Sequence, residues 1–294
     1  MLFFAALVVD GALAGAIYAL IALAFVVVYK ASRMINFALG EWIMVGAGLV
    51  AAGVHGAGLP LAPALVTASA GMIGLALGFN RLVLRPLVGR PVIALIMVTL
   101  GFGALLRGTS SIALAGVPRR LALPIPSDPI AVAGLVVPAE KVTAAAVALV
   151  AIALLTWAFH RSRAGVALRA IAADQQVAMA MGIDLGRYFA ITWGIVGVIA
   201  VLAGTLWTAV AGGGLGLVIV GLKVFPIVVI GGLDSIAGTL VAAVLIGVLE
   251  ALAAGYADPL LGSGFSNVAS YIALIAMLVA RPYGLFGRAD VVRI

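Results

Sequence analysis

The chain has 294 residues, of which 65% are hydrophobic and only 9% are charged. Soluble domains hold about 45–50% apolar and about 25% charged residues, so this composition excludes a soluble protein and indicates a polytopic membrane protein. No cysteine is present, which excludes disulfides and thiol chemistry, and two histidines with ten scattered carboxylates offer little for metal binding or nucleophilic catalysis. The net charge of +7 reflects arginines between apolar segments, a pattern of basic cytoplasmic loops rather than of nucleic-acid binding.

Apolar segments of about 20 residues are long enough to cross a bilayer as helices. We expect an all-α membrane bundle of about eight or nine spans, some short or broken, forming one membrane domain over residues 1–294. The first segment is kept as a span, because it lacks a basic n-region and is too long for a signal-peptide core. The predicted helices lie near 4–29, 37–54, 60–83, 91–115, 138–159, 188–211, 217–233, 235–256 and 267–281.

The distribution of basic residues predicts the orientation of the chain. An outside N-terminus and a cytoplasmic C-terminus place most of them inside, as the positive-inside rule requires. The cytoplasmic set is Lys30, Arg33, Arg81, Arg85, Arg90, Arg161, Arg163, Arg169, Arg281, Arg288 and Arg293. The outside then receives Arg119, Arg120, Lys141, Asp128, Glu140 and Asp258.

Proline and glycine mark the connections and the packing. The segment 116–138 contains Pro118, Pro124, Pro126 and Pro129, which preclude a continuous helix and predict an ordered or extended external loop. Within the spans, Gly11 and Gly15 are four residues apart, as are Gly74 and Gly78. Small residues at this spacing let helix backbones approach closely in lipid, so we expect both pairs to lie at helix contacts.

Polar residues at membrane depth are costly and need a reason. Asn36 and Glu41 interrupt the apolar pattern soon after Lys30 and Arg33. One interpretation is a short or broken helix whose polar groups face protein or water. The alternative is a carboxylate at a helix start, where the helix dipole favours it.

Lys223 is flanked by apolar residues on both sides, three positions before Pro226, and Glu250 lies at comparable depth on the next helix. The lysine either lines a substrate path or is satisfied structurally, by snorkelling or by an ion pair with Glu250. Pro226 is expected to kink its helix. A tight glycine turn at the cytoplasmic side follows, formed by Gly231, Gly232, Asp234, Ser235 and Gly238.

The stretch from 161 to 187 is the one long polar run. One face of it is small and apolar at helical spacing, and Gly182 and Gly186 bracket a break. This pattern predicts a short helix, a corner and a return into the membrane. Either it is a solvated connector, or it docks a soluble partner. The apolar face comprises Leu168, Ile171, Ala172, Gln175 and Met179.

Four segments in order, at 18–42, 85–108, 165–187 and 223–252, resemble the branched-chain amino acid permease family of ABC importers, specifically its shorter permease subunit. The departures are small: the family often has glycine where Asp234 stands, alanine near Val224 and histidine where Leu39 stands. These departures do not change the expected class, a transporter. They leave the substrate open, because members of the family carry branched-chain or other amino acids, amides or urea.

The resemblance implies that the cytoplasmic loop couples to an ATPase subunit, with the helix from Gly165 to Met181 inserted in its groove. The coupling residues are Arg169, Asp174, Ala178, Met181, Gly182, Ile183 and Arg187, and the candidate pathway residues are Asn36, Glu41, Thr99, Lys223, Pro226 and Glu250. The implied partners are a paralogous permease, two ATP-binding subunits, an extracytoplasmic binding protein and the lipid of a bacterial inner membrane.

The chain contains no P-loop, so no cofactor is expected in it, and ATP with magnesium belongs to the partner ATPase. We therefore expect a non-catalytic permease. A permease for urea or short amides is the alternative within the family. A stand-alone secondary transporter should show a midplane carboxylate pair or cation site, with inverted repeats. We find no clear repeat, and only Glu41 and Glu250, on distant helices, could form such a pair. The third class, a membrane enzyme such as a prenyl or acyl transferase, should show paired acidic motifs like DDxxD or a catalytic histidine, and this sequence contains neither.

Overall fold

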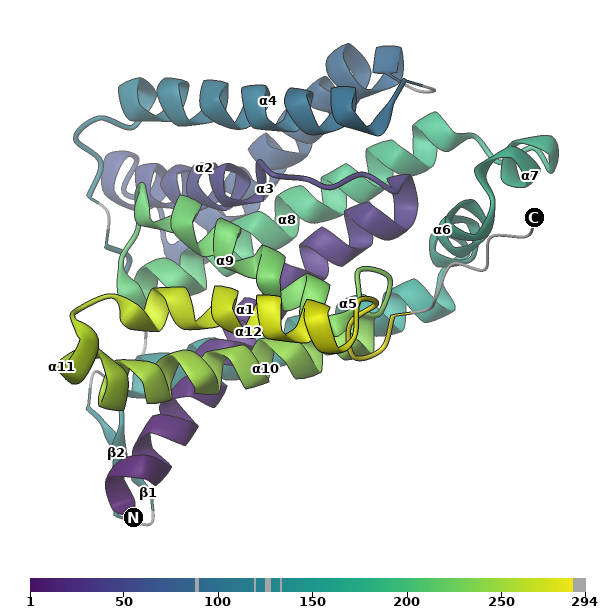
Figure 1. Ribbon diagram of the computed structural model, residues 1–294. Helices are drawn as coiled ribbons and strands as arrows, with labels where there is room; N and C mark the ends of the chain where they lie inside the picture. Colours follow the sequence, from purple (N-terminus) through teal and green to yellow (C-terminus); the bar gives the residue numbers. More distant parts are fainter. Residues whose placement is uncertain (88–89, 119, 125–127, 133, 288–294) are drawn as a thin grey trace. The chain divides into compact units, whose positions relative to one another are not determined.

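The computed structural model describes residues 1–87, 90–118, 120–124, 128–132 and 134–287 (Figure 1). These residues are mostly helical, as the sequence predicts. The exception among them is one β-hairpin. The chain forms two compact units, and the boundary between them falls inside three of the helices. Unit 1 comprises 1–26, 125–149 and 223–294, and unit 2 comprises 27–124 and 150–222.

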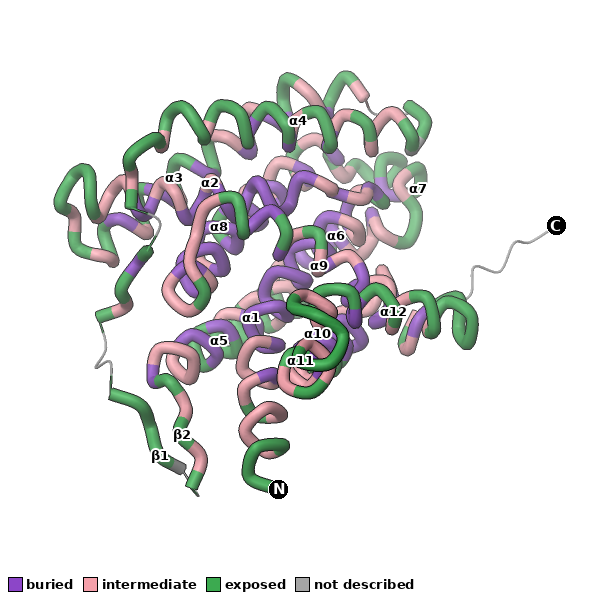
Figure 2. The backbone as a smooth tube through the Cα atoms, turned by 60° about the vertical axis from the view of Figure 1, so that its left-hand side comes forward, coloured by how far each residue is buried: buried purple, intermediate pink, exposed green. Residues whose placement is uncertain are grey.

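Unit 2 is built on α2 (Leu39–Ala51), α3 (Leu61–Phe79), α4 (Val92–Ala113) and α8 (Leu185–Ala211), which lie side by side (Figure 1). Aromatic rings from all four helices meet in its core. The ring of Trp42 lies 5.5 Å from that of Trp193, and the rings of Phe79 and Phe102 are 4.1 Å apart. Such contacts add to the burial of the large side chains, so this cluster fixes the four helices against one another. The buried stretches of α2 and α8 contrast with the mostly exposed α4 (Figure 2).

Unit 1 combines the first part of α1 (Leu2–Ser32) with α10 (Ile236–Leu252), the short α11 (Asp258–Leu261) and α12 (Phe265–Ala280). It also contains the antiparallel hairpin of β1 (Ile130–Val132) and β2 (Leu135–Val137), where Ile130 pairs with Val137. Two helices cross the unit boundary besides α1: α5 (Ala139–Arg161) and α9 (Gly216–Gly231).

The nine predicted helices are all present, with ends within a few residues of those expected. Within the described residues, seven are long and apolar enough to span a membrane, while α9 and α12 are shorter. Three predicted spans continue through π-helical turns: η1 (Ala52–Gly56), η2 (Asn80–Leu84) and η4 (Ala253–Ala257). A 3₁₀ turn, η3 (Arg85–Leu87), follows η2. The proline-rich segment contains the hairpin instead of a helix, as predicted. Arg119, Pro126, Arg288 and Arg293 lie outside the described residues.

The two glycine pairs have different surroundings. A Cβ atom on Gly11 would lie 2.5 Å from the carbonyl oxygen of Gly247, and one on Gly15 would lie 2.8 Å from the Cα of Val244. Here α1 and α10 touch backbone to backbone, as the spacing predicts. For Gly74 and Gly78 the prediction is wrong, because a Cβ on either would meet no described atom within 4 Å. Small residues permit a close approach but do not ensure that a helix lies opposite.

This contrast gives a prediction for one chemical change at two sites. Gly11→Ala forces a methyl group into the Gly247 backbone and should lower the free energy of unfolding by about 1–3 kcal/mol. Gly74→Ala meets open space and should raise stability by up to about 1 kcal/mol, through helix propensity. Thermal unfolding in detergent measures both, and equal midpoints for the two variants would contradict the α1–α10 contact.

Candidate functional site

The polar run folds into two short helices, α6 (Arg163–Ala173) and α7 (Gln175–Ala180). The expectation of one helix from Gly165 to Met181 is therefore wrong. Asp174 has extended backbone angles, φ −157° and ψ 116°, and its carboxylate accepts hydrogen bonds from the backbone N–H groups of Gln176 at 2.7 Å and Val177 at 3.0 Å. A carboxylate that satisfies the first amides of a helix is an N-cap, so Asp174 ends one helix and starts the next.

Gly182 ends α7 in the left-handed conformation, with φ +83°. Its N–H donates to the Met179 carbonyl at 2.9 Å, and the Ile183 N–H donates to the Ala178 carbonyl at 3.0 Å. These two bonds form a Schellman motif, which needs glycine at the left-handed position. Gly186 was expected to close the break but lies inside α8. The break ends instead at Asp184, whose carboxylate caps α8 by accepting from the Arg187 N–H at 3.2 Å.

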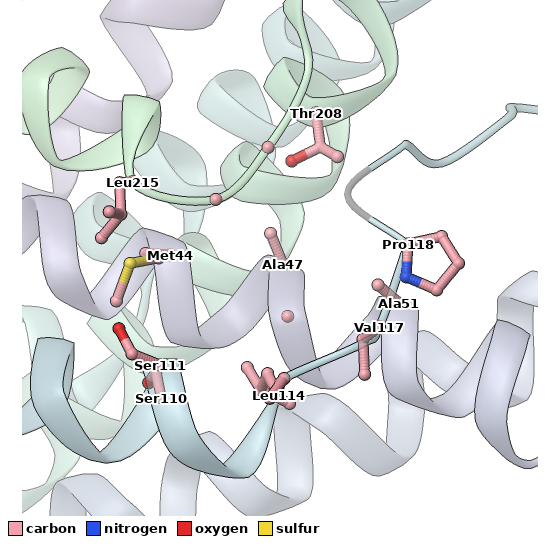
Figure 3. A pocket seen from close by; sticks show the side chains of 14 residues that line it. Met44, Ala47, Ala51, Ser110, Ser111, Leu114, Val117, Pro118, Thr208 and Leu215 are labelled. Carbon is pink, nitrogen blue, oxygen red and sulfur yellow. The ribbon is translucent and has the colours of Figure 1, made fainter.

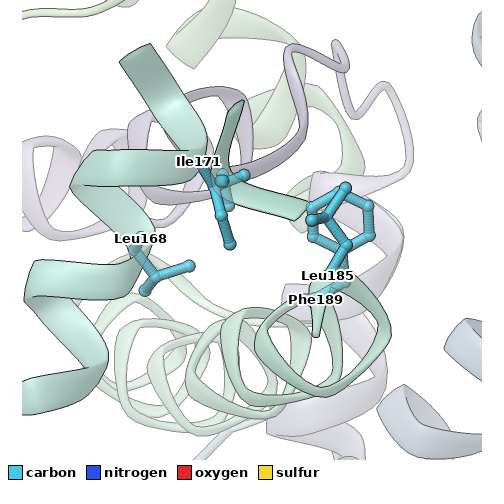
Figure 4. Packing of buried hydrophobic residues seen from close by; sticks show 6 residues of the cluster. Leu168, Ile171, Leu185 and Phe189 are labelled. Atoms are coloured by element: carbon cyan, nitrogen blue, oxygen red, sulfur yellow. The ribbon is translucent and has the colours of Figure 1, made fainter. Parts of the chain in front are cut away.

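The inner face of α6 and α7 is anchored on the rest of unit 2 by a small apolar cluster (Figure 4). Leu168 and Ile171 pack with Leu185 and Phe189 of α8, and Ala178 joins them from α7. Polar contacts add to this anchoring. The Arg33 guanidinium donates to the Ala172 carbonyl at 3.0 Å, and the Arg169 guanidinium donates to the Phe159 carbonyl at 2.6 Å. The element is therefore held on the ends of α1, α5 and α8.

The outer face of the same element carries exposed apolar side chains, although it lies outside the candidate spans. We call Val166, Val177, Met179 and Met181 the α6–α7 apolar surface; their exposed fractions run from 51% for Met179 to 79% for Met181. The helical spacing predicts Met179 on the same apolar face as Leu168 and Ile171, but its side chain is exposed whereas theirs are buried. Exposed apolar patches beyond the lipid mark protein contacts, and methionine adapts readily to a partner. This observation favours docking over a solvated connector.

The connection from α1 to α2 is the expected break in a helix. Residues 33–38 are not helical, and the buried Asn36 accepts from the Ala38 N–H at 3.0 Å. The Thr99 hydroxyl accepts from the Phe37 N–H at 3.4 Å and donates to the Ile96 carbonyl at 2.9 Å. Within the described structure, the buried Asn36 Nδ2 group has no hydrogen-bond partner. The break therefore presents a free amide donor inside unit 2.

Glu41 lies in the first turn of α2, as the dipole interpretation also expects. Its side chain is 5% exposed and forms an ion pair with Arg107 of α4, whose side chain is 49% exposed. Arg107 was not among the residues singled out from the sequence. A cation inside an otherwise apolar predicted span was the available signal, because such a charge needs a partner.

Lys223 and Glu250 form an ion pair, as one of the two interpretations of the sequence expects. The Lys223 ammonium lies 3.1 Å from Glu250 Oε2, and both side chains are almost buried, at 12% and 10% exposed. The Tyr18 hydroxyl of α1 donates to the same oxygen at 2.9 Å. Tyr18 was missed as a partner, although its hydroxyl is the polar group of an otherwise apolar part of the first span. Three helices of unit 1 thus share one carboxylate.

The glycine turn after α9 has the predicted form. The helix runs through Pro226 to Gly231, Gly232 has φ +101°, and the Ser235 hydroxyl caps α10 by accepting from the Gly238 N–H at 3.0 Å. A Cβ on Gly231 would lie 2.5 Å from the Thr239 nitrogen, so the two helices need glycine there. The last described residues of the chain cover this turn, since the Leu285 N–H donates to the Ile230 carbonyl at 2.7 Å.

A small pocket of about 80 Å³ lies at the other end of α8 from α6 and α7 (Figure 3). Met44 of α2, Ser110 of α4, Thr208 of α8 and Leu215 line it. The Thr208 hydroxyl is buried and has no partner in the part of the chain that is described. At about 30 Å³ per water, the space suits two or three waters or a group of a few carbon atoms.

Comparison with known proteins gives a consistent result. A family profile described as the permease component of branched-chain amino acid transport systems matches residues 7–281. The high-affinity branched-chain amino acid transport system permease protein LivH of Salmonella typhimurium is 30% identical, over 100% of this chain and 98% of the relative. LivH of Escherichia coli K12 has the same identity and coverage, and BraD of Pseudomonas aeruginosa is 28% identical over 97% and 96%.

The shared carboxylate generates a prediction about stability. Lys223→Met leaves Glu250 buried with only the Tyr18 hydroxyl, and breaking such a pair should cost about 3–5 kcal/mol. The double change Lys223→Met/Glu250→Gln should recover most of this loss, because no unpaired charge remains. Thermal unfolding of the two variants in detergent measures the effect.

The more exposed pair of Lys141 and Asp10 in the same unit provides a matched control, since the Asp10 side chain is 47% exposed. Lys141→Met should cost at most about 1 kcal/mol. Equal losses for Lys141→Met and Lys223→Met would show that the Glu250 pair has no special structural weight.

Proposed function

Because the chain belongs to the family of branched-chain amino acid transport permease components, we propose that it forms half of the translocation pathway of an ABC importer for branched-chain or related amino acids. Its apolar helices make it a multi-pass membrane protein. The match over 7–281 covers both units, so the resemblance concerns the whole membrane part and not one motif. In this proposal the protein performs no catalysis itself.

The proposed partners follow from what the chain lacks and from what it exposes. The sequence has no GxxxxGK[ST] motif for nucleotide phosphates, so two separate ATP-binding subunits bind ATP and magnesium and supply the energy. A second permease, a paralogue, completes the pathway, and an extracytoplasmic binding protein delivers the substrate. The observation that carries the proposal is the α6–α7 apolar surface, which is firmly anchored yet exposed outside the spans.

The proposed pathway residues fall into one group in each unit. In unit 2, Asn36, Glu41 and Thr99 lie around the broken helix between α1 and α2, where Asn36 offers a free donor. In unit 1, Lys223, Pro226 and Glu250 lie on α9 and α10. A polar group in a low-dielectric path binds a zwitterion more strongly than in water. Normal uptake by Lys223→Met/Glu250→Gln would show that the charged residues of the second group are not part of the pathway.

The proposed location is the bacterial inner membrane, with the N-terminus outside and the C-terminus cytoplasmic. Single cysteines can report this orientation, because the natural chain has none. Gln176→Cys in α7 should react with an impermeant maleimide only after the membrane is opened. Asp128→Cys in the proline-rich segment is the external control and should react in intact cells. External labelling at position 176 would reverse the topology.

Coupling is tested at the corner after α7. A Cβ on Gly182 would meet no described atom within 4 Å, so Gly182→Trp adds bulk to the exposed corner without an internal clash. The matched control is Gly182→Ala, because alanine meets the same left-handed backbone strain as tryptophan but is small. Both variants should insert in the membrane. The tryptophan variant should lose at least about tenfold in substrate-stimulated ATP hydrolysis, the effect of about 1.4 kcal/mol of lost docking.

The alanine variant should keep most of that activity in the same reconstituted system. Substrate uptake by Gly182→Trp at the rate of the unaltered protein would refute the coupling assignment. Equal loss in both variants would point to backbone strain at position 182 instead of a blocked contact.

A further inference from the structure

A long apolar groove opens on the side of unit 2, with a volume of about 780 Å³. The floor is a stripe of α8 that includes Ala190, Gly194 and Val198, and the walls include Leu77 of α3 and Leu154 of α5. The side chains of Leu77 and Leu154 are 47% and 61% exposed, and both lie in candidate spans. The groove therefore faces the hydrocarbon of the bilayer.

The floor carries no side chain at Gly194 and only a methyl group at Ala190. A Cβ on Gly194 would meet no described atom within 4 Å, so the space above it is open. From Arg187 to Leu202 the lining follows α8 over 16 residues, whose 15 steps of 1.5 Å make about 22 Å. One leaflet of hydrocarbon is about 15 Å thick. The groove can thus hold an acyl chain along the full depth of a leaflet.

One end of this groove is cationic. Arg187 lines it, is the third residue of its span and is exposed, and its guanidinium has no partner among the residues described. Arginines also lie at the same ends of the other two helices that form the groove. Arg81 is in η2, four residues after Leu77, and Arg161 is the last residue of α5. The ends of α3 and α8 are joined there, since Asn80 Nδ2 donates to the Gly186 carbonyl at 3.3 Å.

We propose that this groove binds an anionic phospholipid, with an acyl chain along α8 and the phosphate group on the Arg187 guanidinium. A guanidinium binds phosphate oxygens in a two-pronged geometry, and basic positions between helices on the cytoplasmic side hold anionic headgroups. The small residues Ala190 and Gly194 would also admit a helix of a second protein. The guanidinium at headgroup level favours the lipid, because a purely apolar helix contact leaves it unused.

The test uses the full-length protein in detergent, titrated with phosphatidylglycerol or phosphatidylcholine of identical chains and followed by native mass spectrometry. Arg187→Gln should weaken phosphatidylglycerol binding about fivefold, the effect of one basic side chain at an anionic lipid surface, and leave phosphatidylcholine binding unchanged. Gly194→Leu should weaken the binding of both lipids, because it fills the groove.

Two variants control for charge and for bulk. Arg163→Gln removes an exposed arginine of α6 outside the groove, and Gly74→Leu adds the same side chain to a part of α3 that does not line it. Neither should change lipid binding. Equal effects of Arg187→Gln and Arg163→Gln would overturn the headgroup contact. A Gly194→Leu protein that binds both lipids normally would overturn the assignment of the groove to a lipid. If the same variant also loses a second subunit, the occupant of the groove is a helix of that subunit.

Discussion

The backbone of this protein must satisfy its own hydrogen bonds, because lipid hydrocarbon offers neither donors nor acceptors. Interruptions of its helices are therefore accompanied by a side chain or a turn that replaces the lost partner. Asn36 and Thr99 accept backbone N–H groups at the break between α1 and α2. Ser235 does so after the glycine turn, and the carbonyl groups of that turn are taken up by the last described residues of the chain. Among the proposed pathway residues, Asn36 thus lies where a helix stops, whereas Lys223 and Glu250 lie within α9 and α10.

Local capping also explains the order of residues in the polar run, although α7 lies outside the candidate spans. Asp174, Ala178, Gly182 and Ile183 are spaced so that the six-residue helix α7 is capped at both ends. Asp174 holds the first amides, Gly182 reverses the chain, and Ile183 packs against the cluster that contains the buried Ala178. A helix as short as α7 has little stability alone, because nucleation is costly, so these contacts are what keep it formed. The residues between them are free to face outward, which is where the exposed methionine and valine side chains lie.

Much of this architecture could be predicted, because hydrophobic length, proline positions and capping residues are local signals. The helix ends, the hairpin-bearing segment and the turn after α9 all follow from them. The break at Asp174 could not be predicted from periodicity, since apolar residues at helical spacing continue from Leu168 to Met179. Nor could glycine spacing distinguish Gly11, which touches another backbone, from Gly74, which touches nothing described. The partners Arg107 and Tyr18 lie 66 and 232 residues from their carboxylates, a separation at which sequence alone says only that a buried charge needs some counterpart.

The distance along the chain between Tyr18 and Glu250 also matters during synthesis. Unit 1 joins the first 26 residues and residues 125–149 to those from Lys223 onward, whereas all of unit 2 lies between residues 27 and 222. At the usual ~5–20 residues per second, roughly 10–50 s pass between synthesis of Tyr18 and of the Glu250 that accepts its hydrogen bond. Unit 2 can finish folding in that interval, while α1 waits in the bilayer with its glycine face and its tyrosine hydroxyl uncovered. The order of translation thus leaves the Tyr18 hydroxyl and the Gly11–Gly15 face of α1 without their partners until α10 has been made.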